Sequence, residues 1–487
     1  MKQKPILIIG AGPAGLTVAY ELSKKIESPI VVVENSPSVG GLSQNIYFKD
    51  KIIDIGGHRF YTGYKRVIQF WNEIYPFELK KENNSKFLIK KREVAILFNQ
   101  KMFDYPIRLQ VSLLWKLGFY NFLNIIRDYL KERFKRKKEI TNLEEILISR
   151  FGKKLYELFF KEYTLKVWGI PSNKIKPEWA DQGIDPISIR SILLNSLKNF
   201  SRKKTAYTLS ALEEGETFLY PKLGPGAFWE EVHRRVSDSN TKFMYNHSIS
   251  EIQVENNEIK KIIIINNKTM EKKEYSPEFV FSSIPIKDLF NYFPKKTSEE
   301  NLFKIAAHLQ YRDYVIVPFL VKKFSLPVKK PYNYEWVYIN TPEVKLARLQ
   351  IFDNWSPFLN KEKDLNWIGV EYFCNEGDLF WNKPDKEIIK NAINELKKIN
   401  ILTEQDVVDS TIIRKTKAYP VYSGSFIDLD KIHSYLNNIK NLYPIGRNGM
   451  HRYLNLDQVV LTAISSVEMA LSGKTVKDSL WKIGDPS

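Results

Sequence analysis

The sequence feature that most constrains the fold is the run Gly10-Ala11-Gly12-Pro13-Ala14-Gly15. It directly follows the apolar residues 6–9 and opens a helical pattern over residues 16–22. A strand, a tight turn and a helix in this order form the pyrophosphate-binding unit of dinucleotide-binding domains. Gly10 permits the turn, Gly12 lets backbone amides approach the phosphates, and Gly15 lets the helix close on the strand. The run therefore predicts a dinucleotide site, with Pro13 and Ala14 at the start of its helix.

A second strand and an acidic residue follow at the spacing of this unit. The apolar residues 29–33 end in Glu34, 19 residues after Gly15. A carboxylate in this place accepts hydrogen bonds from the adenosine ribose hydroxyls and repels a 2′-phosphate. We therefore expect Glu34 to bind the cofactor, and the alternative is a glycine turn that holds no ligand.

Two glycine pairs favour a flavin over a nicotinamide cofactor. They lie in Gly40-Gly41-Leu42 and, after the strand pattern 51–55, in Gly56-Gly57-His58. Without side-chain bulk the main chain can lie against a large flat ligand beyond its pyrophosphate. On these residues the chain resembles the glutathione-reductase-like FAD proteins of the amine oxidase and protoporphyrinogen oxidase superfamily. The resemblance implies FAD as cofactor, with Gly41, Leu42 and Gly57 beside it. The sequence contains no second GxGxxG that would indicate a separate nicotinamide domain.

Composition narrows the cellular setting and the classes of partner. Cys374 is the only cysteine, which fits a reducing, cytoplasmic compartment and excludes a thiolate metal cluster. The six histidines lack ligand spacing, so no metal site is expected. A formal net charge of +18 favours anionic ligands, but no nucleic-acid-binding motif accompanies it.

The densest basic run, residues 131–138, follows an amphipathic stretch over 111–130. A core helix followed by a solvated basic turn is the first interpretation of this pattern. Peripheral contact with the inner face of the membrane is the alternative. No stretch of about 18 apolar residues predicts a membrane-spanning helix.

The fold class implied is α/β: a Rossmann FAD-binding domain of the glutathione-reductase type, an inserted helical region and an antiparallel-sheet substrate domain. Residues 1–75, 205–290 and 405–487 are expected to form one discontinuous FAD-binding domain. Residues 76–204 are expected to form an inserted, mainly helical region, because helical periods dominate over 105–160. Residues 291–404 are expected to form the substrate domain, since strand patterns rich in Tyr, Trp, Val and Phe occur over 311–373.

Further cofactor contacts are implied by the same resemblance. Ile249 lies where related flavoproteins hold the adenine through a backbone amide and carbonyl. A strand pattern over 441–445 ends at Gly446-Arg447, and a helical pattern over 457–471 begins at Asp457. A helix amino terminus that faces the flavin pyrimidine stabilises the negative charge of the reduced state. We therefore expect Gly446, Arg447 and Asp457 to contact the cofactor.

Within that superfamily the chain is similar to the flavin-dependent UDP-galactopyranose mutases, especially those of the eukaryotic type. Five stretches carry this narrower resemblance. They are Gly40-Gly41-Leu42 with 54–58; Lys166-Val167-Trp168-Gly169-Ile170-Pro171; Tyr220-Pro221-Lys222 through Trp229; Arg348 through 351–357; and Ala418-Tyr419-Pro420 with Gly446-Arg447 and Arg452-Tyr453.

The chemistry of these mutases supplies roles for the matched residues. Their reduced flavin attacks the anomeric carbon of a nucleotide-linked hexopyranose through N5, and the sugar opens and recloses as a furanose for surface glycan biosynthesis. By resemblance, Arg348 neutralises the diphosphate, and Tyr338, Tyr419 and Tyr453 donate hydrogen bonds to it. His58 lies beside the flavin, and Trp168 and Trp336 wall the base or sugar. NAD(P)H is a candidate reductant.

Two departures and two alternatives accompany this interpretation. The mutases carry a second phosphate-binding arginine after Glu178-Trp179, where this chain has Gly183, and the segment 455–458 retains only part of their Asn-Gln-Asp-His-like sequence. Arg348 could instead be a structural ion-pair partner. The alternative function is an FAD-dependent oxidoreductase that acts on an amine or an isoprenoid or other lipid.

Overall fold

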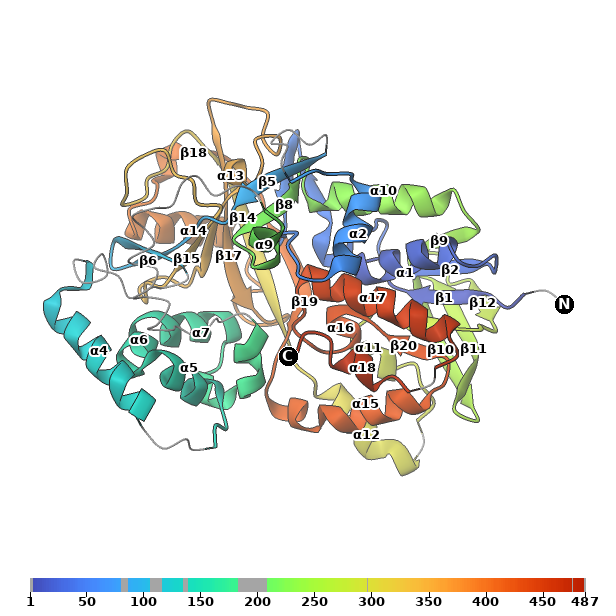
Figure 1. Cartoon of the computed structure of the whole chain (residues 1–487). Helices are drawn as coiled ribbons and strands as arrows, with labels where there is room; N and C mark the ends of the chain where they lie inside the picture. Colours follow the sequence, from blue (N-terminus) through green and yellow to red (C-terminus); the bar gives the residue numbers. More distant parts are fainter. Residues whose placement is uncertain are drawn as a thin grey trace.

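The structure is a computed structural model that describes residues 3–79, 86–105, 116–134, 139–182, 208–295, 297–474 and 476–485. Gly183 and the basic residues 135–138 therefore lie outside the described residues. Figure 1 shows two neighbouring sheet-based regions, one containing β1 and β2 and the other containing β14 and β17, with the helices α4 to α7 beside the second.

A five-stranded parallel sheet forms the nucleotide-binding core. Its strands run in the order β20-β13-β1-β2-β9, so that three segments far apart in the sequence meet in it. Their bounds are β1 Ile6–Ile9, β2 Ile30–Glu34, β9 Thr241–Tyr245, β13 Val280–Ser282 and β20 Leu442–Pro444.

Both faces of this sheet are covered, which explains why β1 is entirely apolar and β2 is apolar up to Glu34. Ile6 and Ile8 pack on the helices α1 (Pro13–Ser23), α2 (Lys65–Ile74), α10 (Pro225–Ser237) and α17 (Leu456–Leu471). Leu7 and Ile9 pack on the other face. That face is covered by the antiparallel strands β10 (His247–Glu255) and β11 (Glu258–Asn266), and by α11 (Ile286–Phe290), α12 (Glu300–Ala307) and α15 (Leu429–Asn438); β12 (Lys272–Tyr275) completes the three-stranded sheet.

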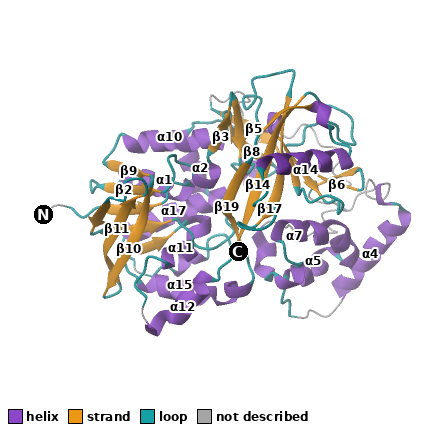
Figure 2. Ribbon diagram, turned by 180° about the vertical axis from the view of Figure 1, so that it is seen from behind, coloured by secondary structure: helices purple, strands orange, loops and turns teal. Residues whose placement is uncertain are grey.

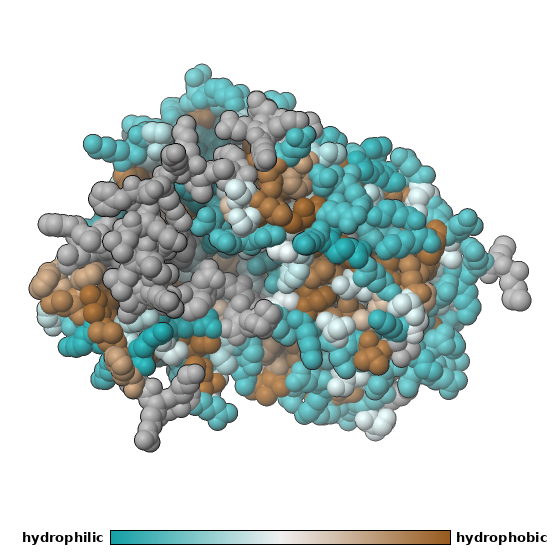
Figure 3. All heavy atoms as spheres, viewed as in Figure 1, coloured by the Kyte–Doolittle hydropathy of each residue, from teal (hydrophilic) through white to brown (hydrophobic). Residues whose placement is uncertain are grey.

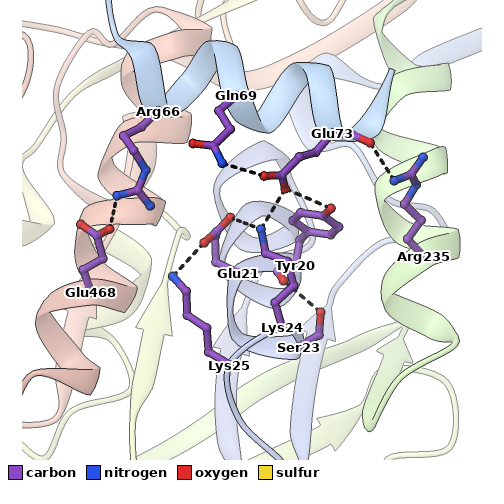
Figure 4. A network of polar contacts seen from close by, with 10 residues as sticks. All are labelled: Tyr20, Glu21, Ser23, Lys24, Lys25, Arg66, Gln69, Glu73, Arg235 and Glu468. Atoms are coloured by element: carbon purple, nitrogen blue, oxygen red, sulfur yellow. Dashed lines mark hydrogen bonds and ion pairs between the residues drawn. The ribbon is translucent and has the colours of Figure 1, made fainter. Parts of the chain in front are cut away.

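A polar network joins the helices on the first face, as Figure 4 shows. The Glu73 carboxylate of α2 accepts hydrogen bonds from Tyr20 and Lys24 of α1, at 3.3 and 2.9 Å. Arg235 of α10 donates to the Glu73 backbone carbonyl at 2.9 Å, and Arg66 of α2 pairs with Glu468 of α17. The network therefore links all four helices at their solvent-facing side.

An eight-stranded mixed sheet forms the second region. Its order is β18-β14-β17-β16-β15-β6-β7, and β19 also pairs with β14. Only β15 and β6 run parallel to each other; the other pairs are antiparallel. The bounds are β6 Val94–Phe98, β7 Lys101–Asp104, β14 Tyr311–Val321, β15 Trp336–Ile339, β16 Arg348–Ile351, β17 Asn366–Cys374, β18 Val407–Ser410 and β19 Ile413–Pro420.

Helices cover the two faces of this sheet. Phe319 and Val370 belong to a core cluster that includes α14 (Asp385–Lys398). Tyr314 and Ile316 belong to another, which includes side chains of a helical group. That group, seen with the sheet in Figure 2, comprises α4 (Phe119–Phe134), α5 (Leu143–Phe151), α6 (Lys153–Leu155), a π-helical turn (Tyr156–Phe160) and α7 (Lys161–Trp168).

The α/β class with a Rossmann unit and antiparallel sheets is confirmed, but the expectation that residues 76–204 are mainly helical is wrong at its start. The segment contains β5 (Phe87–Lys91), β6 and β7, and the last two join the eight-stranded sheet. Short apolar runs have no period that separates a strand from a buried helix. The β6–β7 turn, with positive φ at Asn99 and Gln100, also lacks the glycine that typifies such hairpins.

The expected boundary at residue 405 is also wrong. The strands β18 and β19, which were expected in the FAD-binding domain, pair with β14. Likewise β8 (Thr217–Pro221) pairs with β5 rather than with the parallel sheet. Local patterns indicate strands, but the partner of a strand is set by long-range packing that a local pattern does not encode.

The remaining short elements are connections. They are β3 (Asn45–Phe48), which pairs with β4 (Lys51–Asp54), and α9 (Leu209–Glu213), α13 (Phe352–Trp355), α16 (Gly446–Gly449) and α18 (Asp478–Trp481). Among the described helices, none is both long enough and apolar enough to span a bilayer.

Candidate functional site: a dinucleotide cradle beside an arginine-lined cavity

The glycine run folds as the sequence predicts. Gly10 ends β1 with φ +98°, and a Cβ on it would lie 2.3 Å from the Ser283 hydroxyl oxygen. A Cβ on Gly15 would lie 1.9 Å from the carbonyl oxygen of Gly10, so only glycine lets α1 approach the strand this closely. The helix begins at Pro13, and no side chain caps its amino terminus. Its first-turn amides are thus suited to an anionic ligand such as a pyrophosphate.

A cavity of about 240 Å³ lies over this helix start, and we call it the dinucleotide cradle. The Glu34 carboxylate at its rim accepts hydrogen bonds from the amides of Ala11 and Ser36, at 2.7 and 2.8 Å. Nine of the residues expected to bind the cofactor line the cradle: Gly10, Gly12, Pro13, Ala14, Glu34, Gly41, Leu42, Gly446 and Arg447.

A buried carboxylate shapes the loop that leads out of the cradle. Asp54, at the end of β4, accepts hydrogen bonds from the backbone amides of Gly56, Gly57 and His58 at 3.0, 3.1 and 2.9 Å. It also accepts one from the Tyr220 hydroxyl at 3.0 Å and lies 2.8 Å from Nδ1 of His58. The Gly-Gly-His turn is therefore wrapped around a single carboxylate.

The ionised form of Asp54 is favoured despite its burial. Burial alone would raise the pKa of this carboxyl, but the His58 ring and the hydrogen bonds from His58 and Gly56 more than offset it, and the pKa of Asp54 is lowered. An ionised carboxylate is an acceptor only, so Nδ1 of His58 carries the proton that it shares with Asp54. Nε2 is then the ring nitrogen that is left for other partners.

A second cavity, of about 280 Å³, lies on the other side of this loop, and we call it the arginine-lined cavity. Leu42, His58, Arg447 and Leu456 line both cavities, so the two are adjacent. Among the described residues that line the second cavity, none is acidic. Its polar and aromatic lining includes Arg59, Arg92, Arg348 and Arg447; the tyrosines 61, 105, 163, 314, 338, 419 and 453; and the tryptophans 168, 179 and 336.

The structure brings together every residue expected to bind the substrate. Trp168, Trp336, Tyr338, Arg348, Tyr419 and Tyr453 all line the arginine-lined cavity, although they come from four strands or helices and one loop. Tyr419 and Tyr453 stack with ring centroids 5.7 Å apart. Arg447 lies over both rings and donates hydrogen bonds to the carbonyls of Ala418 and Leu454, so its guanidinium fixes this corner of the cavity.

Arg348 is both a cavity residue and an ion-pair partner. One of its terminal nitrogens lies 2.5 Å from the Glu371 carboxylate of the neighbouring strand, and it donates to the Tyr419 hydroxyl at 3.1 Å. The rings of Trp336 and Phe373 lie 4.5 and 4.6 Å from its guanidinium carbon. Burial is the largest influence and opposes its charge, but Glu371 together with Tyr419 and Tyr163 more than offsets it and raises the pKa of Arg348, so the guanidinium stays charged.

Hydrogen-bond donors without acceptors gather in this cavity. Seven buried N–H atoms of its lining residues have no hydrogen-bond partner among the described residues, and none of the unpartnered buried oxygens belongs to the lining. The seven are Nε and one terminal nitrogen of Arg59, Nε of Arg92 and Arg348, and the indole nitrogens of Trp168, Trp179 and Trp336. A site in this state lacks acceptors, which an oxygen-rich anionic ligand supplies.

Four expected cofactor residues lie outside the cradle. Gly57 lines the arginine-lined cavity instead, and Gly15, which closes α1 on β1, lines neither. Ile249 is buried in β10 opposite Ile264, and Asp457 is buried in the first turn of α17; neither is among the described residues that line the cradle or the arginine-lined cavity. Burial raises the pKa of Asp457 to about 6. The cofactor roles of Ile249 and Asp457 stay predictions.

Sequence reasoning missed Asp54, Glu371, Arg59 and Arg92. Asp54 and Arg59 flank the Gly-Gly-His turn, so their positions carried a signal, and Arg59 is a cation directly before the buried Phe60. Glu371 carried none, because its partner Arg348 lies on the neighbouring strand, and Arg92 carried none, because it lines the same cavity as Arg59 only in the folded chain. Such pairings are visible only in the folded chain.

Comparisons with known proteins agree with this geometry. Residues 8–74 match the family model of the NAD(P)-binding Rossmann-like domain. A crystal structure of reduced UDP-galactopyranose mutase superposes with a TM-score of 0.78 at 18% identity, over 99% of this chain and 96% of that chain. The chain has the UDP-galactopyranose mutase fold.

The mutase fold is shared with redox proteins, and the sequence likeness to a mutase is partial. A putative protoporphyrinogen oxidase from Exiguobacterium sp. 255-15 superposes with a TM-score of 0.68 at 14% identity, over 96% of this chain and 99% of that chain. A probable UDP-galactopyranose mutase of Klebsiella pneumoniae is 24% identical over 185 residues. That alignment covers 36% of this chain and 44% of the Klebsiella protein.

The lowered pKa of Asp54 predicts how stability depends on pH. Asp54→Asn removes a carboxylate with five donors, and we expect a lower thermal midpoint at pH 7, equivalent to about 3 kcal/mol. Because the native pKa lies below the unfolded value of about 3.9, the stabilisation is full above that pH and is lost as the pH falls through the native pKa. Thermal unfolding of both proteins between pH 7 and pH 3 tests this.

Asp238→Asn, at an exposed aspartate after α10, is the matched control and should leave the midpoint unchanged across this range. A difference between Asp54→Asn and the parent that stays constant down to pH 3 would contradict the ionised carboxylate.

Proposed function

We propose that the protein is an FAD-dependent mutase that interconverts the pyranose and furanose forms of a nucleotide-linked sugar, in surface glycan biosynthesis. The observation that carries the proposal is the arginine-lined cavity beside the dinucleotide cradle. It combines four arginines and seven tyrosines with no acidic residue among its described lining. A diphosphate has the charge and the acceptor oxygens that such a lining binds.

The cradle supports FAD as the proposed cofactor. Gly10, Gly12 and Ala14 lie at the uncapped start of α1, and Glu34 lies at the rim where a ribose would bind. When bound and reduced, FAD supplies the nucleophile for attack on the anomeric carbon. NAD(P)H is the proposed reductant.

The chain's own residues bind and orient the sugar nucleotide. Arg348, held by Glu371 and between two aromatic rings, presents a fixed charge to the diphosphate. Tyr338, Tyr419 and Tyr453 supply hydroxyl donors around it. Since Asp54 holds Nδ1 of His58, the histidine has a fixed ring orientation where the two cavities meet.

The competing function is an FAD-dependent oxidoreductase, and the structural likeness to a putative protoporphyrinogen oxidase favours it. Its substrate would be an amine or an isoprenoid lipid. A cationic amine would be repelled by Arg59, Arg92 and Arg348, and an apolar lipid would leave the N–H donors of the cavity without acceptors. The lining therefore supports the mutase more than the oxidoreductase.

A peripheral contact with an anionic membrane is part of the proposal, and α4 is the surface that supports it. Only Ile125 and Tyr129 of this helix are buried. Figure 3 shows apolar side chains along α4 at the edge of the molecule. The exposed apolar residues are Phe119, Tyr120, Leu123, Leu130 and Phe134, and the exposed basic ones include Arg127, Lys131 and Arg133. Aromatic and basic side chains on one exposed helix are suited to an acidic lipid surface.

Isomerisation by the reduced enzyme is the first prediction of the mutase proposal. Purified flavin-loaded protein, once oxidised and once chemically reduced without oxygen, is incubated with a panel of nucleotide-linked hexopyranoses. We expect a product of unchanged mass and altered chromatographic retention only with the reduced enzyme, because the reaction involves no net oxidation. Flavin reduction by an amine or a lipid, without any isomer, would assign the oxidoreductase instead.

The diphosphate role of Arg348 predicts a loss of turnover without a loss of flavin. Arg348→Ala alone would leave Glu371 buried and unpaired, so the informative variant is the double substitution Arg348→Met with Glu371→Gln. We expect turnover to fall by about 100-fold, since a charge-assisted contact is lost, with flavin absorbance unchanged. Glu371→Gln alone is the control that retains the arginine, and full turnover by the double variant would refute the role.

The α4 surface predicts binding to acidic vesicles. We expect the protein to sediment with vesicles of phosphatidylglycerol and phosphatidylcholine but not with phosphatidylcholine alone. The double variant Leu123→Ser with Phe134→Ser should lose most of this binding, whereas Leu379→Ser, at an exposed leucine outside α4, should retain it. Equal sedimentation with both vesicle types would contradict the proposal, as would self-association through α4 without lipid binding.

A further inference from the structure

Arg59 is a buried cation that the proposed roles leave unused. It follows His58 directly, its side chain is 10% exposed, and it lines the arginine-lined cavity. Its guanidinium carbon lies 4.9 Å from the ring of Trp355, 5.3 Å from that of Phe218 and 5.6 Å from that of Trp336. Aromatic faces attract a guanidinium, but they accept none of its in-plane N–H hydrogen bonds.

The charge of Arg59 is incompletely balanced. Its nearest carboxylate is Glu335, 3.5 Å away, without a hydrogen bond to it. Burial raises the pKa of Glu335 to about 7, although Arg59 and Lys90 both oppose this rise. Arg92, a second cation of the cavity lining, repels Arg59. Arg59 and Lys90 thus share the Glu335 carboxylate, and burial makes that carboxylate hard to ionise.

The other arginines of the cavity are in a different state. Arg447 donates its hydrogen bonds to backbone carbonyls, and a terminal nitrogen of Arg348 has Glu371 and Tyr419 as partners, although Nε of Arg348 is unpartnered. Nε and one terminal nitrogen of Arg59, and Nε of Arg92, are buried without a hydrogen-bond partner. Buried donors are almost always paired in folded proteins, so this group is arranged for an acceptor that the described residues do not supply.

Arg59 and Arg348 flank the same indole. Their guanidinium carbons lie 5.6 and 4.5 Å from the Trp336 ring, so a ligand that reaches Arg348 along Trp336 also comes near Arg59. Tyr338, which is expected to contact the diphosphate, stacks on the same Trp336 ring, with ring centroids 6.0 Å apart. The two cations therefore belong to one ligand site and to different parts of it.

We propose that Arg59 and Arg92 form an anion subsite that is separate from the Arg348–Glu371 pair and binds an anionic oxygen group of the ligand. The group is either a phosphate oxygen or a carboxylate on the sugar. In the first case the subsite takes over the role of the arginine that is replaced by Gly183 in this chain. The identity of the ligand as a nucleotide sugar rests on the proposed function. The presence of an anion subsite rests on the unpartnered guanidinium groups alone.

Ligand affinity of the flavin-loaded protein tests the subsite without any need for turnover. The probes are pyrophosphate, UDP, UDP-glucose and UDP-glucuronate, and binding is followed through the fluorescence of the cavity tryptophans. We expect Arg59→Met to weaken at least one anionic probe by 10-fold or more, and Arg59→Lys to restore part of the affinity. Arg234→Met, at an exposed arginine of α10, is the matched control and should bind as the parent does.

The pattern of losses identifies the anionic group. Equal losses for UDP, UDP-glucose and UDP-glucuronate assign a phosphate oxygen, and a loss confined to UDP-glucuronate assigns a carboxylate. Arg92→Met should follow the same pattern with a smaller loss, and it carries the test if Arg59→Met does not fold. Affinities within twofold of the parent for every probe, in both variants, would overturn the subsite.

Failure of the proposed function gives a different result. If the parent protein binds pyrophosphate but none of the uridine nucleotides, the UDP-sugar ligand is wrong, and the Arg59 and Arg92 variants still test the subsite with pyrophosphate. If the parent binds none of the four probes, the subsite itself is refuted.

Discussion

The carboxylate of Asp54 is the interaction on which the site depends. It ends β4 of the nucleotide-binding region and gathers three backbone amides, the His58 ring and the Tyr220 hydroxyl around two oxygens. Tyr220 belongs to β8 and packs on Trp355, whose ring lies against Trp336 of the eight-stranded sheet. One buried charge thus fixes both the turn between the two cavities and the wall that they share. It does so because a desolvated carboxylate is stable only while its hydrogen-bond donors stay in place.

Charge compensation divides the arginines of the cavity into two kinds. The ion pair of Arg348 with Glu371 repays part of the cost of burying both groups, and the carbonyls around Arg447 do the same for that guanidinium. Such cations are already positioned before a ligand binds, and little reorganisation is needed when it arrives. Arg59 is held by aromatic rings and by one carboxylate, Glu335, to which it makes no hydrogen bond, so it gains most from a ligand that brings oxygen atoms.

The sequence predicts the cradle well and the cavity only in part, for a physical reason. The strand, turn and helix around Gly10 and Gly15 are local, because Gly10 is required by its positive φ and Gly15 by its contact with the Gly10 carbonyl. The substrate residues were found by resemblance, and the structure brings all six to one cavity. The pairing of β5 with β8, of β6 with β15 and of β19 with β14, and the contact of Glu371 with Arg348, join separate strands, which no local period encodes.

The cradle and the cavity carry different information about the reaction. A Rossmann cradle with this helix start accepts the same cofactor in enzymes of many activities, so it does not separate a mutase from an oxidase. The distinction lies in the arginine-lined cavity, where β15, β16 and β19 place Trp336, Arg348 and Tyr419 in one lining with the Gly-Gly-His turn. An apolar or cationic substrate would leave seven buried N–H groups without acceptors, each at a cost of about 1–3 kcal/mol. A phosphate-bearing substrate supplies acceptors to the same groups. The chemistry of the protein is therefore constrained most by the absence of negative charge among the described residues that line this cavity.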